Sequence, residues 1–284
     1  MRLATTMSSP EPSVIEVEYR GRLAILTINN PSKLGALNGQ GYYHLAQSLR
    51  EIATHDEVFI TLLIGKGRFF SAGADVTITR TTPQSQTQSP HQQWLSSFVA
   101  NNLNATHAFY THPKILITAL NGPVIGLSAA LISFSDFVYA VPHTFLLTPF
   151  SSLGLVAEGG ASRQLVQKLG PARSGEALIM SRKISSQQLE QCGFVNKVFK
   201  EIGKGEGEDE KFKRLVLEEI DDKLGEHLVG ESLLGIKKLI RRPEREVLDS
   251  HNVAEVFAGL ERFVSGVPQG EFEKIASGKK RHKL

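Results

Sequence analysis

The chain of 284 residues contains 41% hydrophobic and 21% charged residues, as an ordinary globular protein with a large buried core does. Its 32 Lys and Arg against 29 Asp and Glu give a formal net charge of only +3, so the charge does not point to a nucleic-acid surface. One cysteine, Cys192, excludes an internal disulfide, and nine histidines without metal-ligand spacing give no reason to expect a metal site. No apolar run has the length of a signal peptide or a membrane span.

The N-terminal part of the chain predicts two strands, a helix and a third strand. Residues 15–20 alternate between apolar and polar and are followed by residues 23–28 after a short turn, so we expect a hairpin. A helix is expected from its N-cap Asn38 to about residue 55. The continuous apolar run at residues 58–64 is typical of a buried strand. Strand, helix and strand in this order predict a parallel, right-handed unit.

The rest of the chain continues this alternation and then becomes helical. The segment 77–90 is polar and aperiodic and reads as a loop, and the charged, glycine-containing segment 201–210 reads as a boundary. Strands are expected at residues 114–120, 137–140, 145–150 and 193–198, and helices at residues 94–111, 161–169, 175–180, 185–190, 212–228, 231–242 and 252–264.

One acidic residue stands alone in the middle of the chain. Glu158 is the only acid between Asp136 and Glu176, and the residues before it are almost all apolar or small. A carboxylate in such surroundings loses hydration, which raises its pKa toward the range useful for acid and base chemistry. It could equally be an anion at the positive end of the helix expected at residues 161–169. Its immediate sequence context leaves both interpretations open.

Two turns rich in small residues each follow an apolar strand. They are Ser71-Ala72-Gly73-Ala74-Asp75 and the segment 121–128, which begins Asn121-Gly122-Pro123. Ligands bind at the carboxyl ends of parallel strands, and two backbone N–H groups presented there can stabilise a developing oxyanion.

These turns give the chain a family resemblance. Over roughly residues 15–198 the chain resembles the crotonase superfamily of acyl-CoA enzymes. The motifs that carry the resemblance recur in the family's order and at fitting separations: Phe70-Ser71-Ala72-Gly73-Ala74-Asp75, Asn121-Gly122-Pro123, Asp136 and Gly154. The resemblance implies an α/β fold, a spiral of ββα turns followed by a helical C-terminal region that makes trimers, often paired into hexamers. It places the spiral core with the active site at residues 13–200, and the helical region with a targeting tail at residues 201–284.

The resemblance also implies a mechanism. The oxyanion would be held by the N–H groups of Ala74 and Leu127. Hydratases of the superfamily hold a water between two glutamates, but the corresponding positions here are Ala130 and Phe150. Glu158 lies where a hydratase usually has glycine, which resembles the Δ3,Δ2-enoyl-CoA isomerases, most closely the peroxisomal fungal type. One carboxylate would then move a proton from C2 to C4 of a 3-enoyl-CoA and leave a trans-2-enoyl-CoA, in the β-oxidation of unsaturated fatty acids.

Further residues of this site are implied in the same way. Asn102 matches an asparagine that the fungal isomerases place near the base, although the neighbouring Asn101 makes the register ambiguous. Lys33 is a candidate for the phosphates of coenzyme A, together with a basic C-terminal residue of a neighbouring subunit. No cofactor is implied, because coenzyme A is part of the substrate. The remaining candidates for substrate binding are Ala36, Ser71, Ala72, Gly73, Asp75, Gly126 and Phe150.

Three alternative functions stay open. An enoyl-CoA hydratase would need a second carboxylate. A dienoyl-CoA isomerase would also need a second acid, for which Asp136 is the nearby candidate, although a structural role fits it better. A non-catalytic scaffold or RNA binder could use the basic pairs Lys237-Lys238 and Arg241-Arg242.

The last three residues suggest a location. His282-Lys283-Leu284 resembles the Ser-Lys-Leu peroxisomal signal, with His in place of the small first residue. The alternative is a frayed basic tail. Because it agrees with the chemistry, we expect import into the peroxisomal matrix by the receptor that reads this signal.

Overall fold

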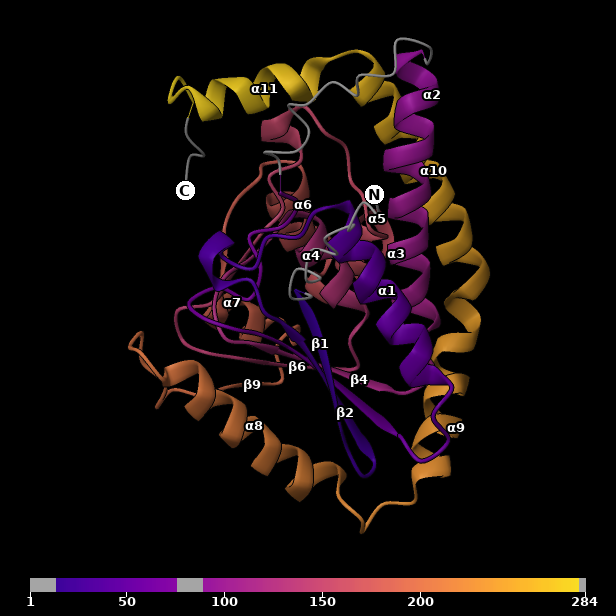
Figure 1. The fold of residues 1–284 in the computed structure, drawn as a ribbon, viewed down its shortest axis with the longest axis vertical. Helices are drawn as coiled ribbons and strands as arrows, with labels where there is room; N and C mark the ends of the chain where they lie inside the picture. The colour runs from indigo at the N-terminus through magenta and orange to yellow at the C-terminus, as the bar shows by residue number, and fades with distance from the viewer. Residues whose placement is uncertain (1–13, 76–88, 281–284) are drawn as a thin grey trace, which may run out of the picture.

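The computed structural model of the protein describes residues 14–75 and 89–280, and a six-stranded sheet lies at its centre (Figure 1). The order of the strands is β1-β2-β3-β4-β6-β9. The predicted hairpin forms β1 and β2, which pair antiparallel, and all other neighbours in this sheet pair parallel. The bounds are β1 (Ile15–Arg20), β2 (Leu23–Ile28), β3 (Ile60–Gly65), β4 (Ile115–Leu120), β6 (Phe137–Ala140) and β9 (Lys197–Val198).

A smaller sheet of three strands lies next to the turns. β5 (Val124–Ile125) pairs parallel with β7 (Phe145–Leu147), and β7 pairs antiparallel with β8 (Ile184–Ser185). The short helices α4 (Gly126–Leu131), α5 (Ala161–Leu169), α6 (Pro171–Leu178) and α7 (Ser186–Gln191) follow these strands, and 3-10 turns occupy Pro31–Lys33, Ile132–Phe134 and Ser151–Leu153. The whole is a mixed α/β fold with a helical C-terminal region.

Both faces of the large sheet are covered, which explains why its central strands β3 and β4 are buried throughout and largely apolar. Alternate residues of β3 point to opposite faces: Ile60, Leu62 and Ile64 pack in one core with α8 (Glu208–Leu224), and Leu63 packs in the other. That second core lies under α1 (Gly39–Ala53) and α3 (Ala100–Thr111).

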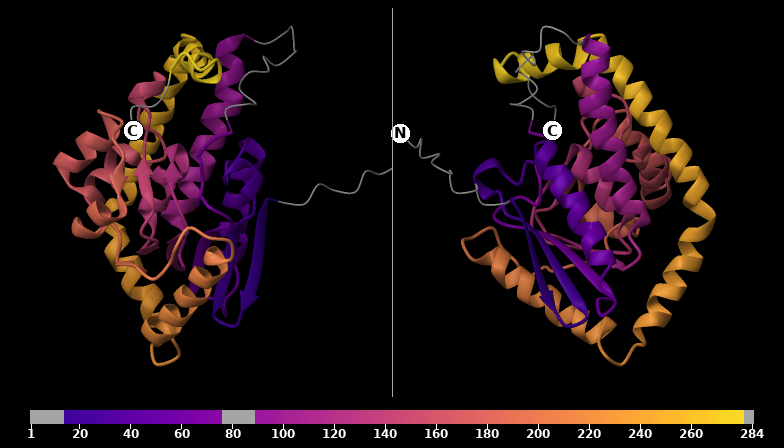
Figure 2. Two further views of the ribbon diagram at one scale, coloured as in Figure 1. Left: turned by 90° about the vertical axis from the view of Figure 1, so that its left-hand side faces the viewer. Right: turned by 45° about the vertical axis from the view of Figure 1, so that its right-hand side comes forward.

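The C-terminal helices wrap around the core. α9 (Gly230–Arg241) and the 3-10 turn Arg242–Glu244 lead into α10 (Arg245–Val264), which extends along the length of the molecule beside α3 (Figure 2). α11 (Val267–Ala276) then turns away from the end of α10 and lies against the 3-10 turn Ser151–Leu153 (Figure 1). No helix within residues 14–75 and 89–280 is long and apolar enough to cross a membrane.

Asp136 anchors α9 to the sheet. Its carboxylate lies 2.7 Å from the Lys237 ammonium and 2.8 Å from the Arg241 guanidinium, and it accepts a hydrogen bond from the Leu116 amide. Asp136 therefore has the structural role that we expected. Two of the four basic residues considered for RNA binding are used in this buried contact.

Several elements differ from the sequence-based expectation: the strand expected at residues 145–150 ends at Leu147, and the helix expected at 175–180 spans Pro171–Leu178. The strand expected at residues 193–198 shrinks to β9, because Gly193 has φ +78° and the amides of Phe194 and Val195 both bond the Leu189 carbonyl in a turn. α10 begins at Arg245 instead of residue 252, since only its second half has a clear apolar spacing. The helix expected at 94–111 is preceded by α2 (Pro90–Trp94) and contains a π-helical turn, Leu95–Val99.

Two predictions fall outside the residues that the structure describes. These are most of the loop at 77–90 and the tail signal His282-Lys283-Leu284. The division of the chain at residues 200 and 201, and the trimer or hexamer, stay predictions.

Candidate active site

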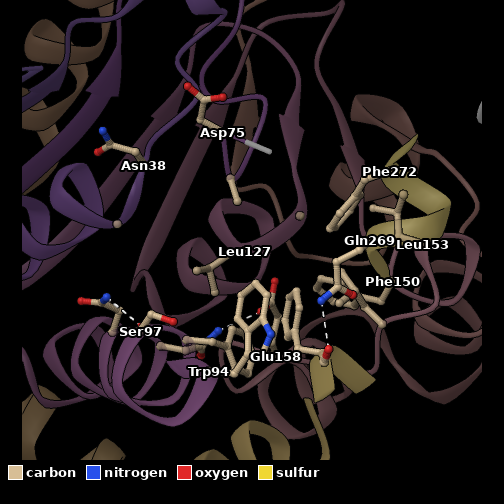
Figure 3. Close-up of a pocket in the computed structure, with 18 of the residues that line it drawn as sticks. Asn38, Asp75, Trp94, Ser97, Leu127, Phe150, Leu153, Glu158, Gln269 and Phe272 are labelled. Carbon is tan, nitrogen blue, oxygen red and sulfur yellow. Dashed lines mark hydrogen bonds between the residues drawn. The ribbon is translucent and has the colours of Figure 1, made fainter. Parts of the chain in front are cut away.

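A cavity of about 780 Å³ opens between the two turns, the helices α2 and α3, and the C-terminal helices α10 and α11 (Figure 3). Its wall is largely apolar, and Asp75 and Glu158 are the acids among the described residues that line it. The apolar and aromatic side chains of the wall include Leu37, Tyr42, Trp94, Phe98, Ile125, Leu127, Phe150, Leu153, Leu155, Phe263, Val264, Phe272 and Ile275.

The two turns are in direct contact at the cavity. A β-bridge joins Ser71 to Val124, and a Cβ added to Gly73 would lie only 2.7 Å from the Ile125 carbonyl oxygen. Gly73 and Gly126 have φ angles of +87° and +61°, which side chains disfavour. Glycine is therefore favoured at both positions by its backbone angle, and at Gly73 it is also needed for the close approach of the two turns.

This contact presents two backbone amides to the cavity. Leu37 bonds the carbonyl of Gly73 and the amide of Asp75, at 3.0 and 2.8 Å, so the N–H of Ala74 between them points away from Leu37. Leu127 is the second residue of α4, where a helix amide has no acceptor in its own helix. Neither amide donates a hydrogen bond to another described residue, so both can receive a negative oxygen.

The carboxyl group of Glu158 faces this cavity. Asn102 donates a hydrogen bond from Nδ2 to Oε2 of Glu158 at 2.8 Å, and the Asn102 side chain is itself held by Thr106, whose hydroxyl donates to Oδ1 at 3.3 Å. The next residue, Gly159, packs against α4, since a Cβ there would lie 2.8 Å from Leu127. Close packing thus fixes the base candidate next to one of the two free amides.

Burial raises the pKa of Glu158 to about 8, and the negative charge of Glu255 adds to this shift, while the Asn102 hydrogen bond opposes it. Glu255, on α10, accepts hydrogen bonds from the amides of Gly160 and Ser162, both at 2.7 Å. The anion at the start of α5 is therefore Glu255. The alternative role that the sequence left open for Glu158 is filled by another residue, and Glu158 is left facing the cavity.

The structure brings most of the predicted site residues together. Ala72, Ala74, Asp75, Asn102, Gly126, Leu127, Phe150 and Glu158 line the cavity. Asn101 lines it as well, but its side chain donates to the Ser97 carbonyl, so Asn102 is the asparagine that contacts Glu158.

Four predicted residues, Lys33, Ala36, Ser71 and Gly73, are not among those that line the cavity. Lys33 forms an ion pair with Asp75 at 2.8 Å, and the Ala36 carbonyl accepts from Asn30. Ser71 is fully buried, and its hydroxyl accepts from the amide of Gly73 at 3.1 Å. These residues shape the first turn or its rim.

Sequence reasoning missed one whole wall of the cavity. Trp94 stacks on Phe263 at a centroid distance of 4.4 Å, and Gln269 and Phe272 come from α11, a helix that we did not expect. Pro268 after Gly266 and the apolar pair Phe272 and Ile275 were the available signals for α11. Glu255 carries no comparable signal, because its partners are about ninety residues away in the chain.

Known proteins resemble the chain over nearly its full length. A Δ(3,5)-Δ(2,4)-dienoyl-CoA isomerase of Pyricularia oryzae is 64% identical over 95% of this chain and 99% of its own. A 3,2-trans-enoyl-CoA isomerase of Saccharomyces cerevisiae is 35% identical over 95% of this chain and 97% of its own. The crystal structure of an enoyl-CoA hydratase/isomerase from Pseudoalteromonas atlantica shares the fold, with a TM-score of 0.80, 24% identity, and coverage of 95% of this chain and all of that one.

The family assignment is direct. Residues 18–215 match the enoyl-CoA hydratase/isomerase family, which confirms the resemblance to the crotonase superfamily and its fold. The protein therefore belongs to the enoyl-CoA hydratase/isomerase family.

Proposed function

We propose that this protein is an enoyl-CoA isomerase that moves the double bond of a 3-enoyl-CoA to the trans-2 position. The observation that carries the proposal is one carboxylate, Glu158, that faces an apolar cavity beside the free amides of Ala74 and Leu127. Relatives named as isomerases over nearly the whole chain support the same class of reaction.

The reaction follows from the two parts of the site. The thioester oxygen accepts hydrogen bonds from the amides of Ala74 and Leu127, which makes the C2 proton more acidic. Glu158 takes that proton, and the C2–H electron pair spreads over a dienolate from the oxygen to C4. The same carboxyl group then returns the proton at C4, and the double bond comes to rest between C2 and C3. The atoms balance without water or a cofactor.

The rate contributions expected of the two amides and of the base are consistent with these separate roles. One oxyanion donor contributes about a hundred- to a thousandfold in rate, and a positioned base contributes about a hundred- to ten-thousandfold. A carboxyl group with a pKa of about 8 suits both halves of the reaction, because it both accepts and returns a proton readily near neutral pH.

A hydratase is less well supported. Its two carboxylate positions hold Ala130 and Phe150, both buried and apolar. The second acid of the described cavity wall, Asp75, is engaged in an ion pair with Lys33. Along the part of the cavity wall that the structure describes, no second free carboxylate is therefore available to activate a water.

A dienoyl-CoA isomerase is the second candidate, and the Pyricularia oryzae relative of that name favours it. That reaction moves the proton from C2 to C6 of a 3,5-dienoyl-CoA. A single carboxylate reaches C4 more easily than C6, so the site favours the shorter transfer.

Both candidates are tested with the purified protein and two substrates, a 3-enoyl-CoA and a 3,5-dienoyl-CoA. The products differ in absorption, since a 2,4-dienoyl thioester is conjugated over two more carbons than a 2-enoyl thioester. We expect the larger kcat/KM for the 3-enoyl-CoA. A larger value for the dienoyl substrate would favour the second candidate, and no turnover of either would overturn the isomerase proposal.

We also propose that the protein acts in the peroxisomal matrix. The terminal His282-Lys283-Leu284 supports this, as does a relative named enoyl-CoA delta isomerase 3, peroxisomal, of Mus musculus, 28% identical over 88% of this chain. A fluorescent fusion at the N-terminus should colocalise with a peroxisomal marker. Deletion of Leu284 should make it diffuse, and unchanged punctate fluorescence would contradict the signal.

The protein is further proposed to form trimers or hexamers. On α9, Ile236, Leu239 and Ile240 are each more than half exposed, and such an apolar face is typical of a surface that another chain covers. Light scattering on the purified protein gives the number of subunits directly, and a monomer would contradict this expectation.

A further inference from the structure

Three buried hydroxyl groups form a chain beneath the two turns. The Tyr42 hydroxyl lies 2.9 Å from the Ser128 hydroxyl, which lies 2.8 Å from the Ser71 hydroxyl. All three side chains are buried, with exposed fractions of 5%, 4% and 0%. They come from α1, α4 and the first turn, three elements that are far apart in the sequence.

The direction of every hydrogen bond in this chain can be worked out. Ser71 donates its one hydroxyl proton to the Gly35 carbonyl at 2.9 Å, so it must accept from Ser128. Ser128 then has no proton left and must accept from Tyr42. Burial raises the pKa of Tyr42 further above its ordinary value, so this phenol keeps the proton that it donates.

The chain of hydroxyl groups links the two peptide segments that carry the free amides. Ser128 directly follows Leu127 in α4. Ser71 accepts a hydrogen bond from the amide of Gly73 at 3.1 Å, and Gly73 directly precedes Ala74. Gly73 and Gly126 have no side chains that could hold the turns in place. The Ser71–Ser128 hydrogen bond is thus a side-chain link between the two peptide segments that carry the amides.

We propose that Ser71, Ser128 and Tyr42 are positioning residues that fix the spacing of the Ala74 and Leu127 amides for the thioester oxygen. The inference rests on the proposed function, since it gives these amides their role. Donors that are fixed before the reaction stabilise a developing charge better than donors that must reorganise. A buried chain with only one possible direction supplies such a fixed geometry, because no hydroxyl can rotate without losing a bond.

A purely structural role is the alternative, and the chain provides a matched control. Thr118 and Ser135 form another buried hydroxyl pair at 2.7 Å, and both are fully buried away from the cavity wall. S135A therefore removes a comparable hydroxyl at a site without access to substrate. Any loss of turnover in S128A beyond the loss in S135A is therefore caused by the location of Ser128 next to the free amides.

The experiment measures thermal unfolding, steady-state turnover of a 3-enoyl-CoA, and the infrared stretch of bound trans-2-enoyl-CoA labelled with ¹³C at the thioester carbonyl. In the wild type the stretch should shift to lower wavenumber on binding. S128A should lose most of that shift and about ten- to a hundredfold in kcat, a part of the effect of one oxyanion donor, with little change in KM. S135A should melt at a lower temperature but keep the shift and kcat.

Two more variants test whether the three groups act as one unit. Y42F leaves the Ser128–Ser71 bond intact, so its loss of kcat should be smaller than that of S128A. S71A/S128A should lose hardly more than the worse single variant, because groups that share one network are not additive. If the loss of kcat in S71A/S128A equals the product of the losses in the two single variants, the proposal is overturned.

The carbonyl shift separates this proposal from the proposed function, since it requires binding but no turnover. If the wild type shows the shift without isomerising the substrate, the isomerase proposal fails and the comparison of S128A with S135A still decides the role of the chain. If S128A keeps the wild-type shift and kcat, or if S135A loses both to the same extent, the positioning role is overturned.

Discussion

Replacing the carboxyl group of Glu158 by an amide, E158Q, tests the proposed base with the least change in shape. A glutamine oxygen can still accept the hydrogen bond that Asn102 donates at 2.8 Å, so the local packing should survive. The amide cannot take up the C2 proton. A positioned base contributes about a hundred- to ten-thousandfold in rate, which is about 3 to 5 kcal/mol of transition-state stabilisation. We expect kcat for a 3-enoyl-CoA to fall by that factor.

E158Q should also be more stable than the wild type at high pH. The folded-state pKa of Glu158 is about 8, above its ordinary value of 4.5. The stability linked to this proton is therefore fully present below about pH 4.5 and is lost as pH rises through 8. One pKa unit corresponds to about 1.4 kcal/mol, so the total loss is on the order of a few kcal/mol. E158Q does not titrate and avoids this loss.

Denaturant unfolding of both proteins at pH 5 and pH 9, together with turnover at pH 8, measures these effects. E158Q should be more stable than the wild type at pH 9, and its advantage should shrink at pH 5. A loss of turnover below tenfold would refute the base assignment. Equal stability differences at both pH values would refute the assignment of a raised pKa to Glu158.

The remaining predictions concern the partners of Glu158 and of Asp136. Because the base works when deprotonated, kcat/KM of the wild type should rise as pH increases through about 8, the pKa of Glu158. E255Q removes a negative charge and should move this rise to lower pH, whereas N102A removes a hydrogen bond to the carboxylate and should move it to higher pH. D136N should reduce the free energy of unfolding by about 3 to 5 kcal/mol, since it leaves the buried ammonium of Lys237 without its counter-ion.

Each of these has a matched control. E244Q removes another carboxylate beside α5, one that pairs with Arg163 at 2.9 Å, and it should leave the pH profile of kcat/KM unchanged. A shift of the same size in E244Q would show that general charge, and not Glu255, sets the pKa of Glu158. For D136N, a change in unfolding free energy below about 1 kcal/mol, typical of an exposed pair, would contradict the anchoring role of Asp136.

The parts of the fold that could be predicted depend on local patterns. The type and spacing of neighbouring residues predict the hairpin and the N-cap at Asn38. They also predict the largely apolar strands β3 and β4. The isolation of Glu158 and the glycines at 73 and 126 could also be read locally, because desolvation and positive φ follow from the residue types themselves.

The parts that could not be predicted depend on contacts between distant segments. Residues 193–198 have a strand-like composition, but the amides of Phe194 and Val195 donate hydrogen bonds to the Leu189 carbonyl near the end of α7. Only two residues are left to pair with β6. Glu255 and the Tyr42–Ser128–Ser71 chain join residues between 57 and 95 positions apart. No periodicity within a single element indicates such pairs, since each hydroxyl or carboxylate alone looks like an ordinary polar residue.

A crystal structure with a bound, non-isomerisable acyl-CoA analogue tests the central claim most directly. We predict that the thioester oxygen lies about 3 Å from the amide nitrogens of both Ala74 and Leu127. A carboxylate oxygen of Glu158 should lie about 3 to 3.5 Å from both C2 and C4 of the acyl chain. A Glu158 side chain turned away from these carbons, or a second carboxylate that holds a water against C3, would contradict the account.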